Sequence, residues 1–148
     1  AIFRAEPLVK DDDTVLVGLP DTVWFPEEGF AALPDAGLSF LLFPVATPQL
    51  FDAVLTSSSG VVSEVRVKST DPGTEWVWGG FKVTGRILRE LYKLWLERDR
   101  CDPYLGTLVN AWLARGNEAR GVRAGTAYVD VGTLNGFREA VRLLGERR

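Results

Sequence analysis

Tyr128-Val129-Asp130-Val131-Gly132-Thr133 joins the end of an apolar strand to the start of a helix. The strand delivers a carboxylate, Asp130, at its C-terminal end. Gly132 allows a tight backbone turn, and Thr133 is a residue type that caps helices. In open α/β sheets, ligands gather at the carboxyl ends of strands, and a helix N-terminus there favours phosphate. The stretch therefore predicts an α/β fold with a ligand site at Asp130; the alternative is that Asp130 only caps the turn.

Working outward from this stretch, strand patterns alternate with helix patterns along the whole chain. The strands are predicted at Thr14–Leu19, Leu38–Val45, Gln49–Thr56, Val61–Lys68, Glu75–Val83, Ala119–Ala124 and Thr126–Val131. Helices are predicted at Ala1–Val9 (the tail of an amphipathic helix), Pro26–Leu33, Gly85–Arg98, Tyr104–Arg115 and after Thr133. The turn at Ser57-Ser58-Ser59-Gly60 indicates a hairpin. Because no linker or repeat interrupts the pattern, residues 1–148 are expected to form a single α/β domain.

Composition excludes several classes of function. The 148 residues contain no histidine and one cysteine, Cys101, which excludes an ordinary zinc site and the Ser-His and Cys-His nucleophilic mechanisms. The net charge of −3 speaks against a nucleic-acid partner. The longest apolar run, near Leu38–Val45, is too short to cross a membrane. With no secretion signal, a cytoplasmic protein is expected. The remaining chemistry, from carboxylates, lysine and backbone, favours oxygen-ligated Mg²⁺.

Two further residues at strand ends could join Asp130 in one site. Asp21 follows an apolar strand, and two carboxylates at strand ends could share Mg²⁺ and its phosphates. Lys68 ends another strand and could neutralise a phosphate. Taken alone, Asp21 is better explained as a solvent-exposed turn residue and Lys68 as a surface lysine. Trp76 and Trp78 alternate on one strand, either as packing residues or as walls for a sugar.

The order of these motifs resembles the C-terminal half of the catalytic domain of the sugar nucleotidyltransferases, which include the glucose-1-phosphate thymidylyl- and uridylyltransferases. The matching stretches are Leu19-Pro20-Asp21, Val67-Lys68-Ser69, Gly79-Gly80 and Tyr128 to Thr133. The resemblance implies a Rossmann-like nucleotidyltransferase fold, a mixed and mostly parallel sheet with flanking helices, present as a partial domain.

The resemblance also implies roles for individual residues. Asp21 and Asp130 match metal ligands, and Lys68 matches the catalytic lysine that contacts the sugar phosphate. The residues matching the substrate-binding positions are Trp78, Gly80, Tyr128 and Gly132. Two departures affect sugar binding: Val67 replaces the family's hairpin glutamate, and Asp52 replaces a glycine of the preceding strand.

The resemblance implies a reaction in which a nucleoside triphosphate and a sugar-1-phosphate give a nucleotide sugar and pyrophosphate, with Mg²⁺ as cofactor. No glycine-rich, arginine-containing nucleotide loop precedes Asp21, so about 90 N-terminal residues of the family's domain are expected to be missing, since nucleotide-binding halves of such folds need several βα units. The chain alone is then expected to be inactive and to self-associate, with a homo-oligomer as one outcome. A non-catalytic binding or assembly module is the alternative, and a glycosyltransferase with two metal-binding aspartates is a third, less well fitted to the motif.

Overall fold

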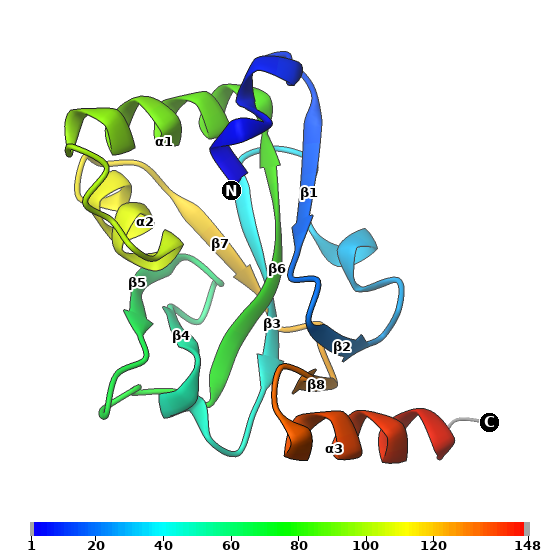
Figure 1. The fold of residues 1–148 in the computed structure, drawn as a ribbon. Helices are drawn as coiled ribbons and strands as arrows, with labels where there is room; N and C mark the ends of the chain where they lie inside the picture. The colour runs from blue at the N-terminus through cyan, green and yellow to red at the C-terminus, as the bar shows by residue number, and fades with distance from the viewer. Residues whose placement is uncertain (1, 147–148) are drawn as a thin grey trace.

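The computed structural model describes residues 2–146, which form a mixed sheet covered by helices on one face and by a small second sheet on the other (Figure 1). The strands are β1 (Thr14–Gly18), β2 (Thr22–Phe25), β3 (Leu38–Pro44), β4 (Asp52–Thr56), β5 (Val62–Val67), β6 (Trp76–Thr84), β7 (Ala119–Val122) and β8 (Ala127–Asp130). The α-helices are α1 (Gly85–Glu97), α2 (Leu105–Leu113) and α3 (Leu134–Gly145). Short 3₁₀ turns are η1 (Ile2–Arg4), η2 (Glu6–Leu8), η3 (Gly29–Ala32) and η4 (Pro48–Leu50). The α/β class and the mixed sheet are confirmed.

The long strand β6 organises the main sheet, whose order is β5-β4-β6-β3-β7. One edge of β6 pairs with β3, while the other pairs with β4 at Val77 and with β1 from Gly80 to Thr84. Among the strands of residues 2–146, β3 and β7 form the one parallel pair. The prediction of a mostly parallel sheet is therefore wrong. An apolar run such as Leu38–Val45 indicates burial on both faces but does not fix the direction of the neighbouring strands.

Strand β3 lies between two hydrophobic clusters, which explains why its sequence is apolar except at Ser39. Leu38, Phe40 and Leu42 face the larger cluster, which α1 and α2 cover. Leu41 and Phe43 face a smaller cluster on the opposite side, where β2, η3 and β8 pack. Successive side chains of a strand point to opposite faces, so this single strand anchors both layers.

The N-terminal segment consists of two 3₁₀ turns rather than the predicted amphipathic helix; Ala1 lies outside the described residues. Pro7 is the physical reason, because proline lacks an N–H and disfavours α-helical geometry in the residue before it. Arg89 of α1 holds the segment in place. Its guanidinium donates to the Glu6 carboxylate at 2.6 Å and to the Val9 carbonyl at 2.8 Å, and it also pairs with Asp11.

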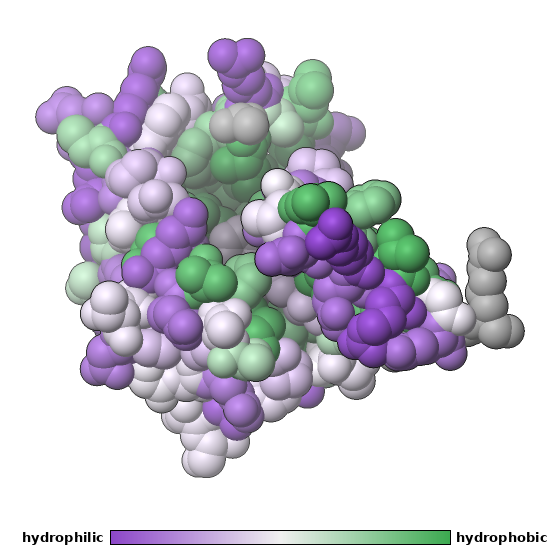
Figure 2. All heavy atoms as spheres, turned by 60° about the horizontal axis from the view of Figure 1, so that its bottom comes forward, coloured by the Kyte–Doolittle hydropathy of each residue, from purple (hydrophilic) through white to green (hydrophobic). Residues whose placement is uncertain are grey.

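The small sheet of β2 and β8 is the main element that the sequence did not predict. Its two strands are antiparallel, with Thr22 opposite Asp130 and Trp24 opposite Tyr128. The predicted cap of the following helix is confirmed, since the Thr133 hydroxyl accepts a hydrogen bond from Gly136 N at 3.0 Å. Along α3, the exposed apolar residues follow a 3-4-3 spacing: Leu134, Phe137, Val141 and Leu144. Figure 2 shows the face that carries α3, where hydrophobic side chains lie exposed beside hydrophilic ones.

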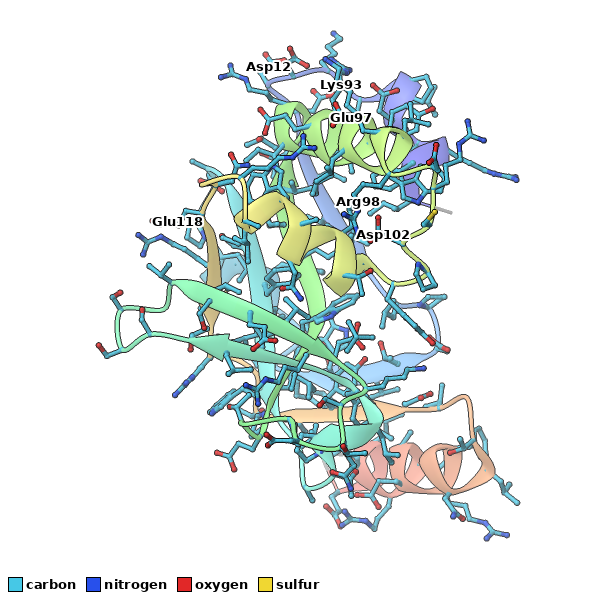
Figure 3. All side chains as sticks on the ribbon, turned by 90° about the vertical axis from the view of Figure 1, so that its left-hand side faces the viewer. Asp12, Lys93, Glu97, Arg98, Asp102 and Glu118 are labelled. Carbon is cyan, nitrogen blue, oxygen red and sulfur yellow. The ribbon has the colours of Figure 1, made fainter. Side chains whose placement is uncertain are left out.

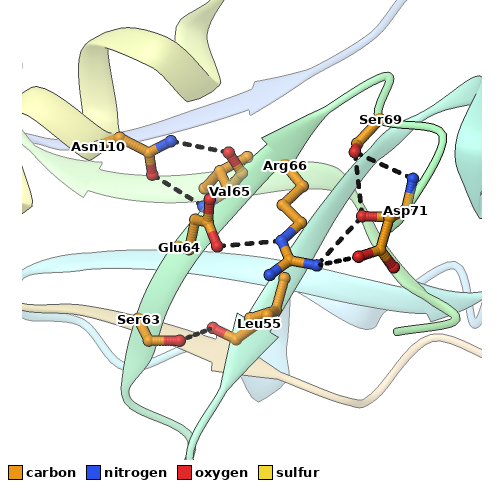
Figure 4. Close-up of polar contacts among 8 residues, drawn as sticks. All are labelled: Leu55, Ser63, Glu64, Val65, Arg66, Ser69, Asp71 and Asn110. Carbon is orange, nitrogen blue, oxygen red and sulfur yellow. Dashed lines mark hydrogen bonds and ion pairs between the residues drawn. The ribbon is translucent and has the colours of Figure 1, made fainter. Parts of the chain in front are cut away.

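Polar contacts fix α1 and α2 against the rest of the molecule. The ion pair of Arg98 and Asp102 closes the connection between the two helices (Figure 3). The Asn110 amide of α2 accepts from Val65 N and donates to Val65 O, each at 2.8 Å (Figure 4). This pair of bonds covers the outer edge of β5, which ends the sheet on that side and would otherwise be free to pair. No helix within residues 2–146 has the length and apolar character needed to cross a membrane.

Candidate functional site

A pocket of about 200 Å³ opens where the carboxyl end of β5, the start of β4 and the β2–β8 sheet meet. Its lining consists of acidic, aromatic and apolar side chains and one lysine: Leu19, Asp21, Thr22, Leu50, Phe51, Asp52, Lys68, Trp78, Tyr104, Tyr128 and Asp130. Five of the seven residues predicted from the sequence therefore line one pocket, although they come from well-separated parts of the chain.

Asp21 and Asp130 lie next to each other because their strands pair. Val131 N donates to Asp21 O at 2.8 Å, across the end of the β2–β8 ladder. A side-chain carbon built at Gly132 would lie 3.0 Å from Asp130 Oδ1 and 3.7 Å from Asp21 Oδ2, so both carboxylates face the same small space. Asp130 Oδ1 also accepts from Gly132 N at 2.7 Å. Asp130 therefore has both of the roles considered from the sequence: it caps the turn, and it lines the pocket.

Lys68 occupies the turn that follows β5. Its φ of 43° is in the left-handed region, and its N–H donates to Phe51 O at 3.1 Å. The next residues are fixed by Ser69, whose hydroxyl bonds both the N–H and the C=O of Asp71 (Figure 4). The Lys68 ammonium lies 5.3 Å from the centre of the Tyr104 ring. Lys68 is solvent-exposed and so lies at the rim of the pocket, with its backbone held in place.

Trp78 and Tyr128 form the aromatic part of the wall. The Tyr128 ring packs 5.2 Å from that of Phe43 and 5.6 Å from that of Phe51, measured between centres. It rests on Gly79, where a Cβ would come within 2.5 Å of the ring. Burial, and then the negative charges of Asp130 and other carboxylates around the pocket, raise the pKa of the Tyr128 phenol, which stays protonated and can donate a hydrogen bond.

The two predicted glycines do not line the pocket. Gly80 is buried in the sheet, and a Cβ there would meet the Phe30 ring at 2.8 Å and Val17 O at 3.1 Å. Its place is explained by close packing between β6 and its neighbours. Gly132 lies beside the carboxylates of Asp21 and Asp130 and contributes its N–H to Asp130.

Asp52 also lines the pocket, although the sequence analysis assigned it no binding role and noted it only as a replacement of the family's glycine. It begins β4 opposite Val67 of β5. Burial raises the pKa of the Asp52 carboxyl, and this outweighs the opposite effects of the Trp78 N–H and of Lys68. The signals available in the sequence were the departure from the family's glycine and an acidic residue at the start of a mainly apolar strand.

The charges around the pocket are unbalanced, because three carboxylates, Asp21, Asp52 and Asp130, face one cation, Lys68. A phosphorylated ligand would be repelled unless a cation were bound with it. No cluster of three or more His, Cys, Asp or Glu that could hold a metal occurs within residues 2–146. Two carboxylates nevertheless fit Mg²⁺, which is ordinarily held by one or two carboxylates together with water and substrate phosphates.

Larger hollows exist elsewhere, and most of their charged side chains already interact with a neighbouring side chain. The hollow of about 520 Å³ between η1 and the α1–α2 connection is lined by Asp102, which pairs with Arg98, and by Arg100, which stacks on Trp95. Another, of about 830 Å³, lies under the start of α3 and shares Tyr128 and Asp130 with the pocket.

Comparison with solved structures identifies similar folds. A protein described as a glucose-1-phosphate thymidylyltransferase from Bacillus anthracis, in complex with a sucrose, superposes with a TM-score of 0.70 at 19% identity, over 95% of this chain and 57% of that one. A UTP-bound UGPase from Acinetobacter baumannii gives a TM-score of 0.70 at 16% identity, over 97% of this chain and 54% of that one. The chain has a nucleotidyltransferase-like fold. It spans a little over half the length of these proteins. No family model and no curated protein matches the sequence.

Proposed function

We propose that this chain is the substrate-side half of a sugar-1-phosphate nucleotidyltransferase. One observation carries the proposal: a single pocket collects Asp21, Lys68, Trp78, Tyr128 and Asp130 in a fold similar to that of two such enzymes. In the reaction, an oxygen of the sugar phosphate attacks the α-phosphorus of a nucleoside triphosphate. The new P–O bond forms as the bond to pyrophosphate breaks. Catalysis of this type depends mainly on positioning and charge neutralisation.

The pocket residues have separate roles in this proposal. Lys68, at the rim, binds and orients the phosphate of the sugar-1-phosphate through a charge-assisted hydrogen bond. Asp21 and Asp130 hold Mg²⁺, which when bound neutralises charge on the phosphates. Tyr128 and Trp78 form walls against the sugar, whose apolar faces suit aromatic rings.

Binding measurements on Lys68→Ala test the proposal. Calorimetry with glucose 1-phosphate in the presence of Mg²⁺ should show an affinity about 10- to 100-fold lower than that of the unmodified chain, since a charge-assisted bond contributes about 1.5–3 kcal/mol. Lys68→Arg should restore part of the loss, because its planar group differs in reach from an ammonium. Lys93→Ala is the matched control, since Lys93 is exposed on α1 (Figure 3).

The metal assignment has its own measurement. Removing Mg²⁺ with EDTA should weaken binding of glucose 1-phosphate and leave binding of glucose unchanged. Without the metal ion, the negative charges of Asp21 and Asp130 repel the phosphate, whereas glucose carries no charge. Equal affinities of the unmodified chain and Lys68→Ala for glucose 1-phosphate contradict the role of Lys68. No binding of the sugar phosphate under any of these conditions contradicts the proposed function and favours a non-catalytic module.

A further inference from the structure

We propose that the Trp78 indole N–H and the Asp52 carboxylate together recognise one hydroxyl group of the ligand. The indole donates a hydrogen bond to the hydroxyl oxygen, and the hydroxyl donates its own hydrogen to the carboxylate. This inference rests on the proposed function, because it assigns the sugar end of the sugar phosphate to a defined part of the pocket.

The first observation is the state of Trp78. Its ring packs against two aromatic neighbours that also touch each other, 6.0 Å from Phe40 and 5.9 Å from Phe81 between ring centres. Its Nε1 is buried and has no hydrogen-bond partner of acceptable geometry within residues 2–146. It is nevertheless close enough to Asp52 to lower the pKa of that carboxyl. A buried N–H without a partner is costly, by about 1–3 kcal/mol, so a ligand acceptor that reaches Nε1 as the pocket adjusts around it offsets this cost.

The second observation is the state of Asp52. Pairing of β4 with β5 fixes its backbone, with Val67 directly opposite, and its side chain lines the same pocket as Trp78. Burial removes water from the Asp52 carboxylate and raises its pKa. The Trp78 indole, the ammonium of Lys68 and the Lys68 N–H favour the charged form and lower the pKa, but burial outweighs them. Tyr128 and the other two pocket carboxylates add no positive charge. Asp52 therefore gains from a hydrogen-bond donor.

Together these two groups select the chemistry of the ligand. A buried donor lies beside a half-buried acceptor, and a hydroxyl group satisfies both at once because it accepts and donates. A phosphate oxygen satisfies the indole but meets the negative charge of Asp52. An ammonium satisfies Asp52 and leaves the indole unpaired. The pair is thus suited to a neutral polyhydroxylated group, whereas Lys68 at the rim is suited to a phosphate.

Asp52→Asn separates this role from a general electrostatic one. Removing a negative charge from the pocket should leave the affinity for inorganic phosphate unchanged or increase it. The affinity for glucose 1-phosphate should instead fall about 10-fold or more, because a charge-assisted bond to a hydroxyl is lost. The matched control is Asp71→Asn, an exposed carboxylate on the loop after β5 that lies outside the pocket lining.

Trp78→Phe provides a second variant and a spectroscopic assignment. Its missing indole signal identifies the Trp78 N–H in the ¹H–¹⁵N spectrum of the unmodified chain. That signal should shift on titration with glucose and with glucose 1-phosphate, but not with inorganic phosphate. The affinity of Trp78→Phe for glucose 1-phosphate should fall about 3- to 10-fold, as expected for one neutral hydrogen bond.

The outcomes distinguish this inference from the function on which it rests. If Asp52→Asn binds glucose 1-phosphate as well as the unmodified chain or better, or if the indole signal does not respond to glucose, the inference is wrong while the role of Lys68 stands. If the unmodified chain binds glucose 1-phosphate no better than inorganic phosphate, and Lys68→Ala changes neither affinity, the proposed function fails. Melting curves check that Asp52→Asn is folded, and it is expected to be at least as stable as the unmodified chain.

Discussion

Gly79→Ala tests whether one wall of the pocket depends on the absence of a side chain. Gly79 is buried in β6, and a Cβ there would lie 2.5 Å from Tyr128 Cε2 and 2.7 Å from Phe43 Cε2. Both neighbours are ring atoms, so neither can move away without displacing a whole aromatic side chain. Because Tyr128 also lines the pocket, the added methyl group should lower stability and also change the shape of the pocket.

The expected cost follows from the overpacking of a buried site, which typically destabilises a protein by about 1–3 kcal/mol. In a chain of this size, each kcal/mol corresponds to about 2–4 °C in Tm, so the midpoint should fall by about 2–12 °C. Gly18→Ala is the matched control on neighbouring β1, since a Cβ there meets nothing within 4 Å. It should be neutral or more stable by up to about 1 kcal/mol, because alanine restricts the unfolded chain.

Urea and thermal unfolding of the two variants decide the question. A second test adds Tyr128→Ala to each glycine variant; removing the ring should recover part of the loss in Gly79→Ala and none in Gly18→Ala, since only the first pair is in contact. If Gly79→Ala and Gly18→Ala unfold within about 0.5 kcal/mol of each other, the close approach of Tyr128 to the strand is refuted, and with it this account of the wall.

Three further predictions follow from particular contacts. Asp52→Asn should raise the free energy of unfolding at neutral pH, because the pKa of Asp52 is raised in the folded chain and its charged form opposes folding. As the pH falls through the folded pKa and below the ordinary value of 3.8, the native carboxylate is protonated and the advantage of the variant should disappear in urea titrations. Asn110→Ala should lower stability by about 1–3 kcal/mol, since it leaves both backbone groups of Val65 unpaired at the sheet edge, whereas Asn135→Ala, at an exposed site on α3, should not. Phe137→Lys should reduce the self-association expected of the chain, because Phe137 is 58% exposed in the apolar stripe of α3; an unchanged sedimentation profile contradicts a role for that stripe.

The sequence predicted the elements that are coded locally. Helices α1 and α2 follow the spacing of their apolar residues, and the hairpin of β4 and β5 follows from its turn, where Gly60 adopts a φ of +82°. The cap at Thr133 is equally local. Each of these depends on residues within a few positions of one another, so pattern and physical cause coincide.

The parts that the sequence could not predict depend on partners far along the chain. Strand β2 has four residues, and its partner β8 lies about 100 positions later. The two adjacent glycines of β6 illustrate the same limit. Gly79 supports a pocket residue while Gly80 accommodates Phe30, and nothing near them in the sequence distinguishes these roles. The direction of the strands that pair with β3 could not be predicted either, because a strand buried on both faces can have parallel or antiparallel neighbours.

Asp52 shows why one residue of the pocket received no binding role from the sequence pattern. Asp21, Lys68 and Asp130 lie at strand ends, where side chains from different elements converge. Asp52 instead begins a strand whose next two residues are buried, where an acidic residue contradicts the local pattern. A carboxylate in that place lowers stability at neutral pH, and it lies beside a buried indole N–H that has no partner of its own. Apolar residues at both positions would stabilise the wall more. Asp52 and the Trp78 N–H thus both depart from the rule that polar groups in such a wall are paired, and one can accept the hydrogen bond that the other cannot. A ligand group that bonds to both is the best explanation, because such local conflicts are expected where a chain binds its ligand.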